Sequence, residues 1–163
     1  MLRDKNLIPL SHQHQRALAL CVRIDRASPI PESDLEAWQA EISQLYRTEI
    51  ATHFAAEEQV LFPEARRFHQ LQLLADELAT DHIELAKTFA IAESRTMSAE
   101  DLLLFSRSLS AHIRKEERQL FEGLQSVMSA EELASAGLRL QVLLKETEAA
   151  CVLPNEATRL RAK

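Results

Sequence analysis

Four histidines and two glutamates of this sequence have the residue types and spacing of a metal site. His53 is followed four residues later by Glu57, and His112 is followed four residues later by Glu116. Residues at this spacing lie on one face of an α-helix, about 6 Å apart along its axis. A set that combines imidazole with carboxylate suits iron, manganese or zinc.

Each of these histidines interrupts the apolar stripe of a predicted helix. His14, for example, follows Leu10 and precedes Ala17 at helical spacing. A buried carboxylate without a partner is costly, and a buried imidazole needs both nitrogens satisfied. One alternative is that these buried polar groups only pair with one another. We favour the other interpretation, in which metal ions are bound by His14, His53, Glu57, His82, His112 and Glu116.

Other histidines and glutamates near these positions are predicted to lie at the surface or to support the site from outside. His12 projects from another face of its helix, and His69 is expected at the surface. Glu58 and Glu117 lie about 100° away from the proposed ligands next to them, so we expect them to support ligands of the site from outside, with Glu117 a further candidate ligand. Glu49, one turn before the second histidine, is a candidate to orient that imidazole.

The composition bounds the class and the partners of the protein. A chain of 163 residues is the size of one domain, and its two glycines argue against an all-β fold. A net charge of -6 makes nucleic acid an unfavourable partner.

Cys21 and Cys151 cannot form a disulfide framework, and the first residues lack the apolar stretch of a signal peptide. No window approaches the ~18 apolar residues of a membrane span. We therefore expect an all-α protein in the cytoplasm.

Five helices are predicted from periodicity, caps and breakers. Pro29 and Pro31 mark a loop after the first helix, and Ser33 with Glu36 has the pattern of a capping box. Pro63 is expected to break or kink the second helix. The predicted helices cover residues 9–26, 33–61, 71–93, 98–127 and 129–147. We expect one domain over residues 1–150 and a C-terminal tail over residues 151–163.

Four long helices with short connections favour an up-down-up-down four-helix bundle with an additional C-terminal helix. In this bundle the histidines of all four helices can lie at the same depth along the bundle axis. The face shared by Leu133, Gly137, Leu140 and Leu144 on the fifth helix should pack either on the bundle or on a second copy of the chain. The protein is accordingly expected to be a monomer or a homodimer.

With these residues in place, the sequence resembles the hemerythrin family in its bacterial HHE cation-binding branch, over residues 7–127. The motifs that carry the resemblance are Leu10-Ser-His-Gln-His14, His53-Phe-Ala-Ala-Glu57-Glu-Gln-Val-Leu-Phe-Pro63, Asp81-His82 and His112-Ile-Arg-Lys-Glu116-Glu117. Proteins of this family hold two non-haem irons bridged by two carboxylates and an oxygen atom. The resemblance implies that Glu57 and Glu116 are the bridges and that the four histidines are terminal ligands. Manganese or zinc could substitute for iron.

The resemblance implies a di-iron protein that binds or senses oxygen, nitric oxide or peroxide, or that handles iron. The sequence departs from the oxygen carriers at Ala86, where they have a second histidine, and at Glu117, where they have an aspartate. The loss of one imidazole implies an additional coordination position and argues against reversible oxygen carriage. A di-iron oxidoreductase in oxidative or nitrosative stress defence is the alternative, so the sequence does not decide whether the protein is an enzyme.

Overall fold

The computed structural model describes residues 2–145, 158 and 159, and all regular secondary structure within them is helical. The all-α prediction is therefore confirmed. Strong helix formers dominate the chain, and its two glycines, Gly123 and Gly137, both lie inside helices.

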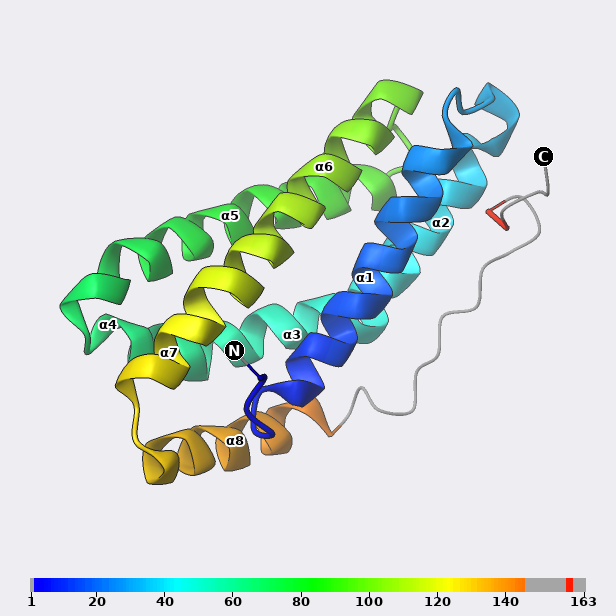
Figure 1. The fold of residues 1–163 in the computed structure, drawn as a ribbon. Helices are drawn as coiled ribbons and strands as arrows, with labels where there is room; N and C mark the ends of the chain where they lie inside the picture. Colours follow the sequence, from blue (N-terminus) through cyan, green and yellow to red (C-terminus); the bar gives the residue numbers. More distant parts are fainter. Residues whose placement is uncertain (1, 146–157, 160–163) are drawn as a thin grey trace.

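The helices form four long segments and a fifth helix. The long segments lie side by side, and the fifth helix crosses one end of them (Figure 1). The first segment packs on the fourth, and the second packs on the third. The fifth helix, α8 (Ala130–Leu144), lies against α3 (Ala51–Ala56) and η3 (Glu57–Leu61). In chain order the segments are α1 (Ile8–Ala27); then η1 (Glu32–Asp34), α2 (Leu35–Leu45), η2 (Tyr46–Ile50), α3 (Ala51–Ala56), η3 (Glu57–Leu61) and α4 (Phe62–Arg66); then α5 (His69–Glu93); then α6 (Ala99–Lys115), η4 (Glu116–Leu120) and α7 (Phe121–Val127); and finally α8 (Ala130–Leu144).

The second and fourth segments contain π-helical turns that the sequence pattern did not predict. These turns are η2, η3 and η4, and they begin at Tyr46, Glu57 and Glu116. A π-helical turn widens the helix without ending it, and such turns are frequent at functional sites. Two of the three turns thus begin at proposed metal ligands.

Two helix boundaries differ from the prediction. The predicted capping box at Ser33 is wrong: a 3₁₀ turn precedes α2, and the Ser33 hydroxyl donates to Asp34 Oδ1 at 3.2 Å. Pro63 does not break the helix, because it lies in the first turn of α4, where a missing N–H costs little. The predicted end of the fifth helix at Thr147, Cys151 and the predicted domain boundary lie outside the described residues.

The apolar core is divided into two clusters, one on each side of the proposed site. Phe62 and Phe121 belong to the cluster near α8. Trp38, Phe89 and Phe105 belong to the cluster at the other end of the long segments. Along α1, α5 and α6–α7 the chain passes from one cluster to the other through a histidine. The polar site is therefore a layer in the middle of the fold, with hydrophobic packing on both sides.

The apolar face of α8 packs on the rest of the same chain. Its residues Leu133, Gly137, Leu140 and Leu144 are buried, as the sequence predicted for the case of packing on the bundle. In the described part of the chain, no helix is both long and apolar enough to cross a membrane.

Candidate metal centre

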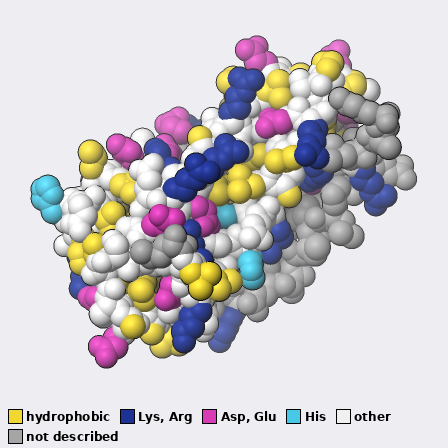
Figure 2. All heavy atoms as spheres, viewed as in Figure 1, with side chains coloured by type: hydrophobic (Ala, Val, Ile, Leu, Met, Phe, Trp, Pro, Cys, Tyr) yellow, Lys and Arg dark blue, Asp and Glu magenta, His cyan; other side chains and the backbone are white. Residues whose placement is uncertain are grey.

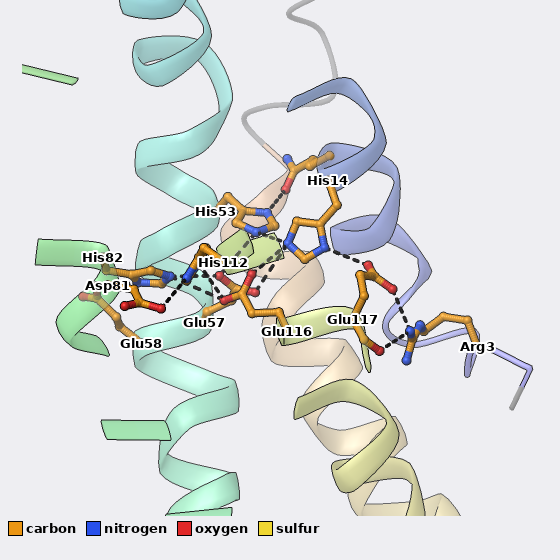
Figure 3. A network of polar contacts seen from close by, with 11 residues as sticks. Arg3, His14, His53, Glu57, Glu58, Asp81, His82, His112, Glu116 and Glu117 are labelled. Carbon is orange, nitrogen blue, oxygen red and sulfur yellow. Dashed lines mark hydrogen bonds and ion pairs between the residues drawn. The ribbon is translucent and has the colours of Figure 1, made fainter. Parts of the chain in front are cut away.

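The six proposed ligands converge from all four long segments into one buried layer (Figure 3). None of the six is more than 3% exposed to solvent. His14 comes from α1, His53 and Glu57 from the second segment, His82 from α5, and His112 and Glu116 from the fourth segment. The structure therefore brings together every residue that the sequence proposed for the site.

Four of these side chains form a first group of donor atoms: His14, His53, Glu57 and Glu116. His14 Nε2 lies 3.2 Å from Glu116 Oε2, and His53 Nε2 lies 3.3 Å from Glu57 Oε2. The two imidazole Nε2 atoms are 2.9 Å apart. One donor atom from each member of the group lies within 4.8 Å of the others, which is compact enough for one metal ion.

A second group contains His82, His112 and Glu116. His112 Nε2 lies 3.1 Å from Glu116 Oε1, and His82 Nε2 lies 3.6 Å from the same oxygen. His82 Nε2 is also 3.5 Å from Glu57 Oε2. Both carboxylates thus face histidines of both groups. Glu116 turns a different oxygen to each group, whereas Oε2 of Glu57 faces both His53 and His82. Glu116 is the carboxylate that the two groups share.

The Nδ1 atom of each imidazole contacts a side-chain oxygen on the side away from the centre. His14 Nδ1 lies 2.7 Å from Glu117 Oε1, and His82 Nδ1 lies 2.9 Å from Glu58 Oε1. A carboxylate can only accept, so Nδ1 carries the proton in these contacts and the Nε2 lone pair is directed into the site.

The other two imidazoles are held in the same way. His53 Nδ1 lies 2.8 Å from Gln13 Oε1, and His112 Nδ1 lies 3.4 Å from Asp81 Oδ2. All four histidines therefore present the same nitrogen to the centre, as metal-ligating histidines with outer acceptors do.

Six buried atoms of the centre lack hydrogen-bond partners. Both oxygens of Glu57 and of Glu116 make no hydrogen bond, and neither does Nε2 of His82 or of His112. An unsatisfied buried polar atom costs free energy, and this cost is greater for charged groups. A cation on each side of the carboxylates would satisfy all of these atoms at once, so the residues present fit a metal site.

Protons compete for the same atoms when no cation is bound. Burial alone lowers the pKa of His14, but its contacts with Glu116 and Glu117 raise that pKa to about 10. His82 is likewise desolvated by burial, and its contacts with Glu116 and Glu57 raise its pKa to about 10. Burial opposes ionisation of Glu116, yet the facing His112 and the other imidazoles hold its pKa well below the usual range. Cation uptake must therefore displace protons from the imidazoles.

Three glutamates next to the proposed ligands were expected to support them, and two of the three do. Glu58 and Glu117 support histidines, as expected, and Glu117 lies outside the converging donor groups. The expectation for Glu49 is wrong: Gln13 contacts His53, and Glu49 accepts from Arg16 Nε at 2.7 Å. Glu49 is on the correct helix, but the acceptor that reaches His53 comes from α1.

Three supporting residues were missed in the sequence, namely Gln13, described above, and two others. Asp81 precedes His82 on α5 but contacts His112 on α6. The Arg3 Nη2 atom forms an ion pair with Glu117 Oε2 at 2.6 Å, and the Arg3 guanidinium stacks over the Phe121 ring. Arg3 therefore holds Glu117, the residue that contacts His14. Neither contact has a spacing signal, because each joins segments that are far apart in the chain. His12 and His69 are exposed, as predicted.

A family model described as the hemerythrin HHE cation-binding domain matches residues 9–124. The chain belongs to this family. No curated protein and no solved structure matches the chain. The six converging residues all lie inside the matched range, and α8 lies beyond it. This hemerythrin domain therefore carries a buried histidine–glutamate cluster of the kind that binds cations.

Proposed function

We propose that this chain is a non-haem di-iron protein that binds or senses oxygen, nitric oxide or peroxide, or handles iron. The iron ligands are His14, His53, Glu57, His82, His112 and Glu116. The observation that carries the proposal is a pair of donor groups that share Glu116, with Glu57 of the first group 3.5 Å from His82 of the second. The four oxygens of these two carboxylates make no hydrogen bond. Two groups suit two ions, with Glu57 and Glu116 as the bridges between them.

The protein residues around the ions fix their geometry and keep bulk water away. Outer acceptors hold each imidazole in one tautomer, and an apolar cluster lies on each side of the polar layer. When bound, iron supplies the ability to take up small oxygen or nitrogen ligands and to exchange electrons with them.

A position for such a ligand is supported on the side of His82. Ala86, one turn after His82 on α5, has no atom that could bind metal. An iron held by His82 and His112 would therefore have no protein ligand from this position of α5.

A di-iron oxidoreductase in oxidative or nitrosative stress defence is the second candidate. The observation that favours it is a row of aromatic rings between His82 and Tyr46. Such a row offers a path for electrons, which a simple ligand-binding protein does not need.

Further parts of the proposal concern the whole molecule. We propose that the four long segments form the up-down-up-down bundle predicted from the sequence, with α8 appended. Residues 1–150 form the domain and residues 151–163 the tail. The protein acts in the cytoplasm as a monomer or homodimer without binding nucleic acid. On the face shown in Figure 2, basic side chains stand in separate groups among acidic and apolar ones, which supports the last point.

The metal proposal is tested with matched histidine variants. His53→Ala and Glu57→Ala should each lower iron content and melting temperature together, because ligand binding and folding are coupled. His12→Ala should change neither, since His12 is exposed on the same helix as His14. Elemental analysis of protein from iron-replete cells should give two irons per chain. Azide or nitric oxide should change its near-ultraviolet absorption. Protein that contains no iron, or ligand variants that retain it, would contradict the proposal.

A further inference from the structure

Four aromatic rings form a continuous series from the metal centre towards the surface. The ring of His82 stacks on Phe54, with centroids 3.8 Å apart and an interplanar angle of 11°. Phe54 contacts Phe89 edge-on at 6.5 Å. Phe89 stacks on Tyr46 at 4.5 Å and 24°. The series therefore links a proposed iron ligand with a phenol through ring contacts alone.

Tyr46 is placed at the solvent end of this series. Its side chain is half-buried and lines the cavity of about 520 Å³ between the second segment and α5. This cavity is open to solvent and is also lined by Arg47 and Glu93. A proton released by the phenol can therefore pass directly to water.

The backbone at Tyr46 has the same irregularity as the backbone at the two carboxylate ligands. The π-helical turn η2 begins at Tyr46, just as η3 begins at Glu57 and η4 at Glu116. Such turns shift the direction of the side chains that follow and are frequent at functional sites. The backbone of the second segment thus departs from regular α-helix at Tyr46 as well as at the proposed ligand Glu57.

We propose that Tyr46 is a redox-active residue that donates one electron to the metal centre through Phe89 and Phe54. The inference rests on the proposed di-iron function and adds a residue that this function alone does not require. The two phenylalanine rings are too difficult to oxidise to hold the charge themselves, so they serve as a closely packed medium between His82 and Tyr46. The phenol is the first group along the series that can be oxidised.

Hydrogen peroxide is the oxidant in the proposed step. It accepts one electron from a ferrous ion and a second electron from the Tyr46 phenol, whose proton passes to water. With two protons taken from solvent, its O–O bond is broken and two water molecules are formed. The ferrous ion becomes ferric, and Tyr46 becomes a neutral tyrosyl radical.

The composition of the chain makes this inference simple to test. Tyr46 is its single tyrosine, and Trp38 is its single tryptophan. Trp38 is buried in the same apolar cluster as Phe54 and Phe89, where Arg23 covers its ring, but it is not part of the ring series. A tyrosyl signal can thus come from one residue only.

The experiment uses full-length protein loaded with ferrous iron, with bound iron measured first. After mixing with hydrogen peroxide and rapid freezing, electron paramagnetic resonance should show a tyrosyl radical. The signal should narrow when the protein is made with ring-deuterated tyrosine. It should be lost in Tyr46→Phe, while the bound iron stays unchanged.

Two phenylalanine variants separate the path from a general effect on packing. Phe89→Leu interrupts the series and should give a several-fold smaller signal. Phe105→Leu removes an equally buried ring that contacts Phe89 but lies outside the series, so its signal should match that of the unchanged protein. A loss of signal in both variants, or in neither, would overturn the assigned path.

The outcomes distinguish this inference from the function on which it rests. Protein that binds no iron contradicts both. Protein that binds two irons but gives no tyrosyl signal, or keeps the signal in Tyr46→Phe, contradicts the role of Tyr46 alone.

Discussion

Three of the four histidines at the centre are backed by carboxylates, and the fourth is backed by an amide. Glu117, Glu58 and Asp81 accept from His14, His82 and His112. His53 contacts the amide oxygen of Gln13. A carboxylate increases the electron donation of an imidazole more than an amide does, because it carries a full negative charge. The two donor groups are therefore not equivalent, and His53 should be the weakest donor of the four.

Without metal, the protein should lose stability as the pH rises from neutrality. The pKa values of His14 and His82 are about 10 in the folded state, against an ordinary value of 6.5. Between these values the folded state binds more protons than the unfolded state, so unfolding releases protons. The stabilisation is complete below about pH 6.5 and is lost as the pH rises through about 10. Thermal unfolding of chelator-treated protein across this range would measure it.

The control for this prediction is a pair of variants on α1. His14→Gln should make the decline with pH shallower, whereas the exposed His12→Gln should leave it unchanged. Iron-loaded protein should show the opposite trend and lose metal on the acid side, because protons then compete for the ligands. A metal-free protein whose melting temperature rises between neutral and alkaline pH would disprove this account of the imidazoles.

At the scale of helices, similar sequence patterns have different outcomes. Ser98 and Ser129 form capping boxes, in which the serine accepts from the backbone three residues later. Ser33 has an equivalent pattern with Glu36 but does not cap α2, because the chain enters this helix through the 3₁₀ turn η1. The two prolines before Ser33 restrict the backbone and favour this entry. A capping pattern is thus sufficient only where the preceding backbone is free to adopt an extended conformation.

The two serines provide a direct measurement of this difference. Ser98→Ala should lower the free energy of unfolding by about 1 kcal/mol, because the Asp101 N–H then loses its acceptor. Ser33→Ala should change it by less than about 0.5 kcal/mol, as expected at a surface position without a cap. Chemical denaturation of both variants would compare them. Equal losses would show that Ser33 caps its helix after all.

In the whole molecule, α8 and the N-terminal segment close one end of the fold, next to the apolar cluster that contains Phe62 and Phe121. Leu7 is buried in the cluster that α8 completes. The side chain of Asn6 lies directly against Gly137, where an added Cβ would be 2.5 Å from Asn6 Oδ1 and 2.7 Å from Asn6 Cβ. Gly137 is thus needed for close approach, since any larger residue must displace the N-terminal segment that also carries Arg3.

Gly137→Ala should lower the melting temperature for this reason. Helix propensity favours alanine by about 1 kcal/mol, but overpacking typically costs about 1–3 kcal/mol, and here the contact lies close to the Asn6 backbone. Gly123→Ala is the matched control, because its Cβ would meet only the flexible end of Leu71 at 2.6 Å. Calorimetry should show a loss for Gly137→Ala and no loss for Gly123→Ala. A stabilised Gly137→Ala would show that the N-terminal segment yields easily.

The sequence by itself determined the helical class, the exposed His12 and His69, and the six residues that meet at the centre. These features depend on composition and on the spacing of residues along one helix face, both of which are local. Burial of a polar residue in an apolar stripe is costly, so the pattern itself carried the information that these side chains share a partner.

Only the tertiary structure decided which residues contact the proposed ligands from outside. Gln13 rather than Glu49 supports His53, Asp81 supports a histidine on another helix, and Arg3 supports Glu117. The π-helical turns and the row of rings from His82 to Tyr46 were also absent from the pattern. The physical reason is that these features depend on the rotation and depth of one helix relative to the next. Packing of the whole chain sets both, and spacing within a single helix does not.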